Sequence, residues 1–255
     1  MNVLNVAARE LRSYFASPIA YMTIFGFLVI TGIFFASYAA VFMDPRALMY
    51  NIPATMDAIL SNLVIVLLLI APALTMRLLA EEQRSGTIEL LMTAPLRDWQ
   101  VVLGKYLAAF ALYLIMLALT LYYPVILLVF GSPDVGVMVT SYVGAILLGA
   151  AFLAVGVLAS ALTRNQIVAA VLALGTLLFL WLIEVFAPLL PTDLTLPLAG
   201  GALNPAEALQ NLSIIHHYFD FTKGIVDTRH VLYYLSVVAI CLFLATRVLE
   251  IRRWR

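Results

Sequence analysis

Charged residues are scarce in this sequence. Asp, Glu, Lys and Arg make up 11% of its 255 residues, whereas 64% are apolar. A soluble domain needs more polar surface than this, so the composition excludes a water-soluble fold. The single cysteine, Cys241, excludes an internal disulfide and a cysteine-rich zinc site, and we expect it to be a buried thiol. The formal net charge is zero, and nothing in the sequence predicts a nucleic-acid partner.

Sequence motifs for nucleotide binding and catalysis are also missing. The Gly-Lys pair at 104–105 has Trp99 where a phosphate-binding loop needs its first glycine, and Tyr106 where it needs Ser or Thr. No His-Glu-x-x-His is present. The adjacent His216 and His217 would point about 100° apart on a helix, which favours interfacial polar residues over a metal pair. We predict that the chain is not an enzyme and itself binds neither metal nor cofactor.

Long apolar runs dominate what is present. Six of them are long enough to cross a hydrocarbon core of about 30 Å as helices. They are Ile19–Val41, Ile59–Met76, Tyr106–Phe130, Val139–Leu162, Ile167–Leu190 and Val231–Leu249. Continuous apolar runs indicate helices, because the strands of a membrane barrel alternate apolar and polar residues. The sequence therefore predicts an all-α integral membrane protein with six transmembrane helices, in one transmembrane domain over residues 1–255.

Lys and Arg are divided unevenly between the two sides of these spans. Of the 14 basic residues, Arg46, Lys223 and Arg229 lie on one side. The others lie on the opposite side: Arg9, Arg12, Arg77, Arg84, Arg97, Lys105, Arg164, Arg247, Arg252, Arg253 and Arg255. Cytoplasmic segments retain basic residues, so both termini and the segment 77–105 are predicted to be cytoplasmic.

Residues 1–17 show helical periodicity. An apolar face contains Val3, Leu4, Ala7, Ala8, Leu11, Tyr14 and Phe15, and a polar face contains Asn5, Arg9, Arg12 and Ser13. This pattern predicts an interfacial helix on the cytoplasmic leaflet, ending where Ser17-Pro18 breaks it. A simple membrane anchor is an equally good interpretation.

The segment 77–105 is the longest polar interruption on the cytoplasmic side. Its charged start at Glu81 is followed by an amphipathic stretch around Leu90. A chain that only needed to turn around would use a few residues here. We therefore interpret the segment as a docking helix for a soluble partner.

The segment 191–230 is the second unusual region and is predicted to lie outside. Pro205 suits the first turn of a helix. An apolar face follows, made of Leu209, Leu212, Ile215, Phe219 and Ile225. One or two short amphipathic helices are expected on the outer face. They would close the outer mouth of a transport pathway, bind another membrane protein, or act as a structural plug.

Two features inside the spans stand out. Small residues four apart in the fourth span, among them Ala145 and Gly149, predict close packing inside the bundle or between two bundles. Glu184 is the one carboxylate within a span, which makes it a functional candidate. Its place near the outer end of its helix also allows a simple contact with interfacial water.

The motif Glu82-x-x-Ser85-Gly86-Thr87-Ile88-Glu89-Leu90-Leu91-Met92-Thr93-Ala94-Pro95, followed by Val102-Leu103-Gly104-Lys105, resembles the cytoplasmic signature of ABC-2 type transporter permeases. The stretches 9–21 and 212–227 look like the gliding-motility-associated permease branch. The copper-processing permeases of nitrous oxide reductase maturation are a more distant resemblance. None of these similarities names a cargo.

The resemblance implies the permease subunit of an ATP-binding cassette exporter in a bacterial cytoplasmic (inner) membrane. It implies pairing with a second permease copy or homologue and with separate ATPase subunits that bind ATP and Mg. An extracytoplasmic membrane-anchored partner and membrane lipid are further expected contacts. The alternative is a non-transporting scaffold or force-transmitting component driven by the same ATPase.

The resemblance also assigns residues. Those expected to couple to the ATPase are Glu82, Arg84, Ser85, Gly86, Thr87, Glu89, Leu90, Leu91 and Pro95. It adds Gly104 and Lys105 as packing residues. The patterns described above supply the other residues expected in packing or gating, which are Gly149, Glu184, Leu212 and Phe219. Within this scheme Ser85 caps the start of the docking helix and Asp98 caps the third-span helix. Lys105 reaches out to the cytoplasmic headgroups.

Overall fold

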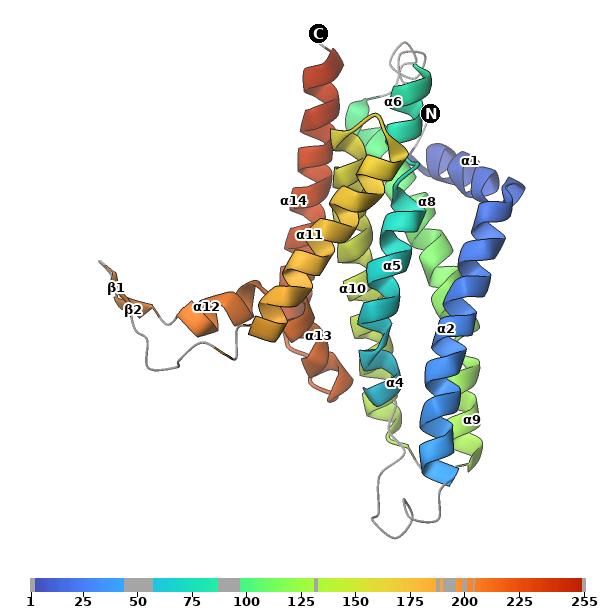
Figure 1. The fold of residues 1–255 in the computed structure, drawn as a ribbon, viewed down its shortest axis with the longest axis vertical. Coiled ribbons are helices and arrows are strands. Elements are labelled where there is room, and N and C mark those ends of the chain that lie inside the picture. The colour runs from blue at the N-terminus through green and yellow to red at the C-terminus, as the bar shows by residue number, and fades with distance from the viewer. Residues whose placement is uncertain are drawn as a thin grey trace.

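The computed structural model describes residues 3–43, 57–86, 97–130, 133–186, 189, 196–198, 201–203 and 205–253. Within these ranges the chain is almost entirely helical, as Figure 1 shows. The predicted all-α class is confirmed, with one addition that the sequence did not indicate. This is a two-stranded antiparallel hairpin of β1 (Leu196–Leu198) and β2 (Gly201–Leu203), in which Leu196 pairs with Leu203.

Six helical segments of the described chain are long and apolar enough to cross a membrane. They are α2 (Pro18–Met43), α4–α6 (Asp57–Ser61, Leu63–Thr75 and Ala80–Ser85), α8–α9 (Asp98–Leu119 and Tyr122–Phe130), α10 (Val135–Leu162), α11 (Gln166–Phe186) and α14 (Thr228–Arg253). They coincide with the six predicted spans, so the chain is a multi-pass membrane protein. Both ends of the described chain lie at the same end of the bundle, here called the termini end (Figure 1).

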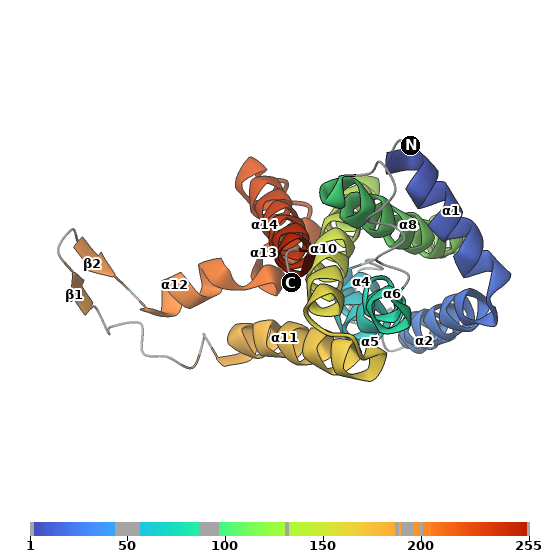
Figure 2. The same ribbon diagram turned by 90° about the horizontal axis from the view of Figure 1, so that it is seen from above.

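The spans differ in how far they are buried. In the most apolar stretches of α4–α6 and α10, 72% of residues are buried, against 17% in α2, α11 and α14. Viewed along the bundle, α10 lies in the middle, with α14 and α11 on its flanks (Figure 2). The outer helices expose large apolar side chains such as Phe25, Ile167 and Leu232. Apolar exposure of this kind suits contact with lipid, whereas packing inside the bundle favours small residues.

The glycines of α10 receive side chains from the surrounding helices. A Cβ at Gly149 would overlap the ring of Tyr113 from α8, and one at Gly144 would lie 2.5 Å from Cβ of Phe221. The Tyr113 hydroxyl also donates to the carbonyl of Ala145 at 2.7 Å. The close packing expected of this span is therefore made by side chains inside the bundle. Small residues here create the space that bulky neighbours fill.

The N-terminal helix α1 (Val3–Ala16) lies crosswise at the termini end and ends where it was predicted to (Figure 1). Pro18 begins α2, and the Ser17 hydroxyl accepts from the Ile19 amide at 3.4 Å. The face of α1 that packs inward differs from the predicted apolar face, because Leu4 is 72% exposed while Val6 is 1% exposed.

At the opposite end, two short helices follow the hairpin. Pro205 begins α12 (Pro205–Leu212), as its fixed backbone angle led us to expect. Ser213 then starts α13 (Ile214–Thr222), and its hydroxyl accepts from the amides of Ile215 and His216 at 3.3 and 3.2 Å. Helix α12 and the hairpin extend sideways from the bundle (Figures 1 and 2).

Candidate functional site

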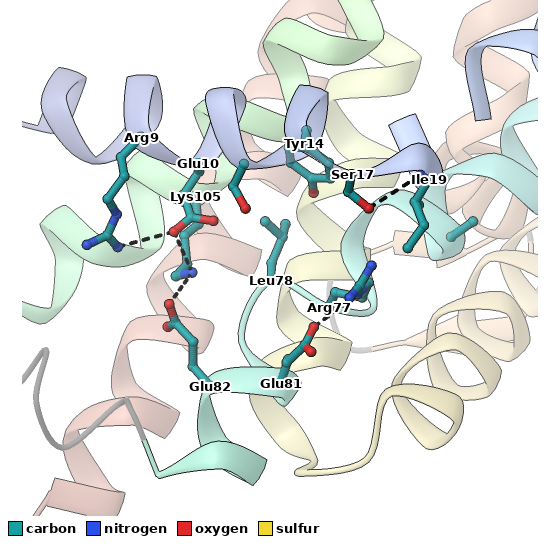
Figure 3. A pocket seen from close by; sticks show the side chains of 12 residues that line it. Arg9, Glu10, Tyr14, Ser17, Ile19, Arg77, Leu78, Glu81, Glu82 and Lys105 are labelled. Atoms are coloured by element: carbon teal, nitrogen blue, oxygen red, sulfur yellow. Dashed lines mark hydrogen bonds and ion pairs between the residues drawn. The ribbon is translucent and has the colours of Figure 1, made fainter. Parts of the chain in front are cut away.

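A buried lysine joins three helices at the termini end. The Lys105 side chain from α8 is 2% exposed, and its ammonium lies 2.8 Å from Oε1 of Glu82 on α6 and 3.2 Å from Oε1 of Glu10 on α1. Figure 3 shows the lysine between the two carboxylates. The prediction that Lys105 extends to the headgroups is therefore wrong. The two carboxylates offset the cost of removing the ammonium from water, and an environment without negative charge would not offset it.

The charges around Lys105 balance. Arg9 Nη2 lies 3.2 Å from the same Glu10 oxygen, so two basic groups face Glu10 and Glu82. Arg77 forms a second ion pair with Glu81, four residues further along the chain, at 3.0 Å. The second oxygen of Glu82 is buried and has no hydrogen-bond partner among the described residues. Since a carboxylate withdrawn from water needs a partner, the contact with Lys105 compensates the charge of Glu82.

Helix α6 is also attached to the end of α10. The Ser160 hydroxyl accepts from the amides of Leu79 and Ala80 at 3.1 and 3.0 Å and donates to the carbonyl of Met76 at 3.2 Å. The side-chain Nε2 of Gln83 donates to the carbonyl of Ala161 at 3.0 Å. The first amides of a helix have no partner within the helix, so Ser160 supplies what α6 lacks at its start.

Helix α6 ends directly before the predicted docking segment. Ser85 is the last residue of α6, and its hydroxyl donates to the carbonyl of Glu81 at 2.9 Å. It therefore bonds back into the last turn of α6, and the docking helix that Ser85 was predicted to cap lies outside the described residues. Gly86 follows with a φ of 72°, a left-handed conformation that favours glycine and commonly ends helices. Arg84 is exposed at this end.

The start of α8 differs from the sequence interpretation. Asp98 is the first residue inside the helix, and Arg97 precedes it in an extended conformation. The Gln100 side chain accepts from the Arg97 amide at 3.1 Å. Asp98 thus lies in the first turn, where its negative charge favours the positive end of the helix dipole. Six residues further on, a Cβ at Gly104 would lie 2.7 Å from Val6, which shows how closely α1 rests on α8.

The remaining predicted coupling residues, Thr87, Glu89, Leu90, Leu91 and Pro95, lie outside the described residues. Of the predicted set, the structure brings Glu82 together with Lys105 and leaves Arg84, Ser85 and Gly86 at the exposed end of α6. Sequence reasoning missed Glu10. A usable signal was present, because Glu10 is one turn from both Val6 and Tyr14, on the face that α1 buries.

A cavity of about 460 Å³ lies beside the lysine, between α1, the end of α5, α6 and α8 (Figure 3). Tyr14 lines it and donates its hydroxyl to the carbonyl of Leu74 at 2.6 Å. Burial raises the pKa of the Tyr14 phenol, and Glu10 adds to this while Arg77 opposes it. Tyr14 is therefore a neutral hydrogen-bond donor that attaches α1 to α5.

The predicted residues at the opposite end are placed differently from expectation. Leu212 is 54% exposed at the end of α12, whereas Phe219 is partly buried against the core. The buried face of α13 is formed instead by Ile214, Ile215, His217, Tyr218, Phe221 and Thr222. The reason is that a new helix starts after Ser213, so one apolar face does not continue from Leu209 to Phe219.

Glu184 lies near the end of α11 and its Oε1 is 3.5 Å from Nδ1 of His216. Its other oxygen is buried and has no hydrogen-bond partner among the described residues. The carboxylate therefore connects α11 with α13 at the opposite end of the bundle.

Comparison with known families gives one match. A family described as ABC-2 family transporter protein matches residues 43–246, which covers well over half of the chain. Proteins of this family are membrane permease components of ABC transporters and are not themselves catalytic subunits. The match does not distinguish a gliding-motility branch within the family. No curated protein matches the chain.

Proposed function

Because the chain belongs to the ABC-2 family of transporter proteins, we propose that it is the permease subunit of an exporter driven by a separate ATPase. In this proposal ATP and Mg bind to the ATPase, which docks on the segment between α6 and α8. The termini end then faces the cytoplasm, in a bacterial inner membrane. Two permease copies, or this chain and a homologue, form the membrane part.

The observation that carries the proposal is the burial of Lys105 between Glu10 and Glu82. The proposed docking segment starts after Gly86 and ends before Arg97, so its two ends are α6 and α8. The lysine joins these two helices close to the segment, because Glu82 precedes it by about one helical turn and Lys105 follows it by about two and a half. A displacement of the segment therefore acts on α6 and α8 together and does not simply bend a loop.

The attachments of α6 extend this connection. Ser160 and Ala161 bind α6 to α10, the central helix of the bundle, and Glu10 binds α1 to the same cluster. Hydrogen bonds and ion pairs between rigid helices are the kind of contact that passes a displacement from one element to another. Docking of an ATPase would in this way move α1, α6, α8 and α10 as one unit.

A reconstitution experiment tests the proposal. The permease is purified with the ATPase that binds it, and binding and stimulated ATP hydrolysis are measured in nanodiscs. Glu89→Lys should weaken ATPase binding, because it reverses a charge on the docking segment. The triple variant Glu10→Gln, Lys105→Met and Glu82→Gln should keep binding but lose stimulation, because it disconnects α6 from α8 without leaving a buried charge.

Lys223→Met is the matched control, since Lys223 is the other lysine of the chain and is exposed. It should preserve both binding and stimulation. Absence of any bound ATPase, or unchanged binding and stimulation in Glu89→Lys and in the triple variant alike, would overturn the proposal.

The proposed orientation has its own test. In a Cys241→Ser background, a cysteine at Asn211 should react with a membrane-impermeant thiol reagent in intact cells. A cysteine at Ser85 should react only after lysis, because α6 is placed on the cytoplasmic side. The reverse labelling pattern would place the docking segment outside and remove the basis for ATPase binding.

A further inference from the structure

All three histidines of the chain lie at the end opposite the termini, and two of them face each other. Nδ1 of His217 on α13 is 2.7 Å from Nδ1 of His230 on α14. The outer nitrogens have partners too. Nε2 of His217 is 3.2 Å from the carbonyl oxygen of Asn211, and Nε2 of His230 is 3.1 Å from Oδ2 of Asp220.

The hydrogen-bond partners of His217 and His230 determine how many protons these side chains hold together. A carbonyl oxygen only accepts, so Nε2 of His217 carries a hydrogen and its Nδ1 is left as an acceptor. The 2.7 Å contact is then a hydrogen bond only if Nδ1 of His230 carries a hydrogen. His230 must therefore donate to His217 on one side and interact with Asp220 on the other.

An extra proton is needed to satisfy both contacts of His230. If Asp220 is ionised, His230 donates from both nitrogens and is an imidazolium. If the proton has moved to Asp220, the carboxyl donates to Nε2 of a neutral His230. Either way, Asp220, His217 and His230 together hold one proton more than a carboxylate with two neutral imidazoles, and the trio is uncharged overall.

The surroundings favour this uncharged state. His217 is 8% exposed, and the side chains of His230 and Asp220 are 14% and 27% exposed. Burial, the largest cause, and the neighbouring histidines lower the pKa of His217, although Asn211 and Asp220 oppose this. His217 is therefore the neutral acceptor in its contact with His230. A trio that lost the extra proton would keep an uncompensated negative charge in a half-buried place.

The other charged groups nearby come from the ends of the same helices. Asp227 and Arg229 lie at the start of α14, and His216 on α13 is paired with Glu184 on α11. Helix α10, which packs against α13, has no charged residue in its sequence from 135 to 162. The nearest permanent cations are Lys223, which follows α13, and Arg229 beside His230 on α14. Among the described residues the ion-pair partner of the Asp220 carboxylate is His230, and neither of these cations lies within ion-pair distance of it.

We propose that Asp220, His217 and His230 form a proton-binding site that fastens α13 to α14 when the proton is bound and loosens this contact when it leaves. Deprotonation leaves His230 with one N–H for two acceptors. Either its Nδ1 lone pair then faces that of His217 across 2.7 Å, or its Nε2 lone pair faces the Asp220 carboxylate across 3.1 Å, and the unbonded pair repels. The hydroxyls of Tyr233 and Tyr234 on α14 donate to the carbonyls of Leu212 and Ile214, at the end of α12 and the start of α13. The movement is therefore confined to α13, whose start stays attached.

Histidine-selective NMR of the full chain in nanodiscs tests the site directly, because three histidines give three sets of ring signals. As the pH is raised, the signals of His217 and His230 should change together in one step. Asp220→Asn should move the midpoint of that step to lower pH by about one unit or more, since it removes the neighbouring negative charge. Glu184→Gln is the matched control and should alter the signals of His216 alone.

Hydrogen exchange of residues 214–222 provides the structural readout. After correction for the intrinsic effect of pH, exchange should become about tenfold faster above the midpoint, as expected for loss of one charge-assisted hydrogen bond. Asp220→Asn should already exchange fast below the wild-type midpoint. The proposal fails if His217 and His230 titrate independently and Asp220→Asn has no effect, or if α13 exchanges at the same corrected rate on both sides of the step.

Zinc provides the last discrimination. Among the described residues no group of three His, Cys, Asp or Glu side chains is arranged to hold a metal ion. The proton step should therefore persist in a chelator and remain unchanged after micromolar Zn²⁺ is added. A step that Zn²⁺ abolishes, with both histidine signals displaced, would make this a metal site and overturn the proton site.

Discussion

At the termini end a lysine and two glutamates join α1, α6 and α8, whereas at the opposite end two histidines and an aspartate join α13 and α14. Lysine and glutamate in an ion pair keep their charges across the physiological pH range, but histidine changes charge within it. The same device, a polar cluster between helix ends, therefore gives a permanent connection at one end. At the other end it gives a connection that depends on a proton.

Breaking the permanent connection should have the largest effect. Lys105→Met leaves Glu82 without its cation and Glu10 with Arg9 alone. Removal of one partner from a buried ion pair costs about 4 kcal/mol. We expect the thermal transition in detergent to fall by about 10 °C. Adding Glu10→Gln and Glu82→Gln should recover most of this loss. A drop below 2 °C for Lys105→Met would show that the cluster does not hold this end together.

The hydroxyl of Ser160 comes next. Ser160→Ala removes the acceptor of two buried amides at the start of α6, at a cost of about 2 kcal/mol. The control is Ser141→Ala near the other end of α10, because the Ser141 hydroxyl bonds only within its own helix, to the carbonyl of Val137. Exchange of the amides of residues 79–85 should increase in Ser160→Ala alone. Equal effects of the two variants would mean that α6 is not held through Ser160.

Packing between the two polar ends should respond less strongly. Gly149→Ala places a methyl group against the buried ring of Tyr113 and should destabilise the protein by about 1–2 kcal/mol. Gly175→Ala in α11 has nothing within 4 Å of the new carbon and should be neutral or slightly stabilising. Thermal unfolding of both variants decides this. The prediction is contradicted if Gly175→Ala is the more damaging one.

The smallest expected effect is on pH dependence, and it separates the two ends. The pKa of His217 is lower in the folded protein than in the unfolded chain. The unfolded chain therefore binds more protons as the pH falls below about 6.5, so stability decreases toward acid pH. The protection of the α13 amides from hydrogen exchange should therefore be greatest at an intermediate pH. It should fall at lower pH, where the protein loses stability, and at higher pH, where the shared proton leaves. Residues 79–85 should show no such maximum, and a maximum at both ends would contradict the comparison.

The sequence was sufficient for the fold class because lipid leaves few alternatives. Backbone groups in lipid must be bonded within each segment, so six long apolar runs predict six helices, and all six are present. The break at Ser17-Pro18 and the start of α12 at Pro205 follow equally from local chemistry, since proline acts on the backbone within one or two residues.

Pairings between distant residues could not be obtained in this way. Glu10 and Lys105 are 95 positions apart, and Lys105 looks like an interfacial lysine until α1 and α6 are packed around it. The buried face of α13 was misplaced for a related reason, because Ser213 ends one helical period and begins another. Hydropathy and charge along the chain thus determined which segments enter the membrane. Only the tertiary structure decided which polar side chains lie together, because burial of a charge depends on partners that other helices bring.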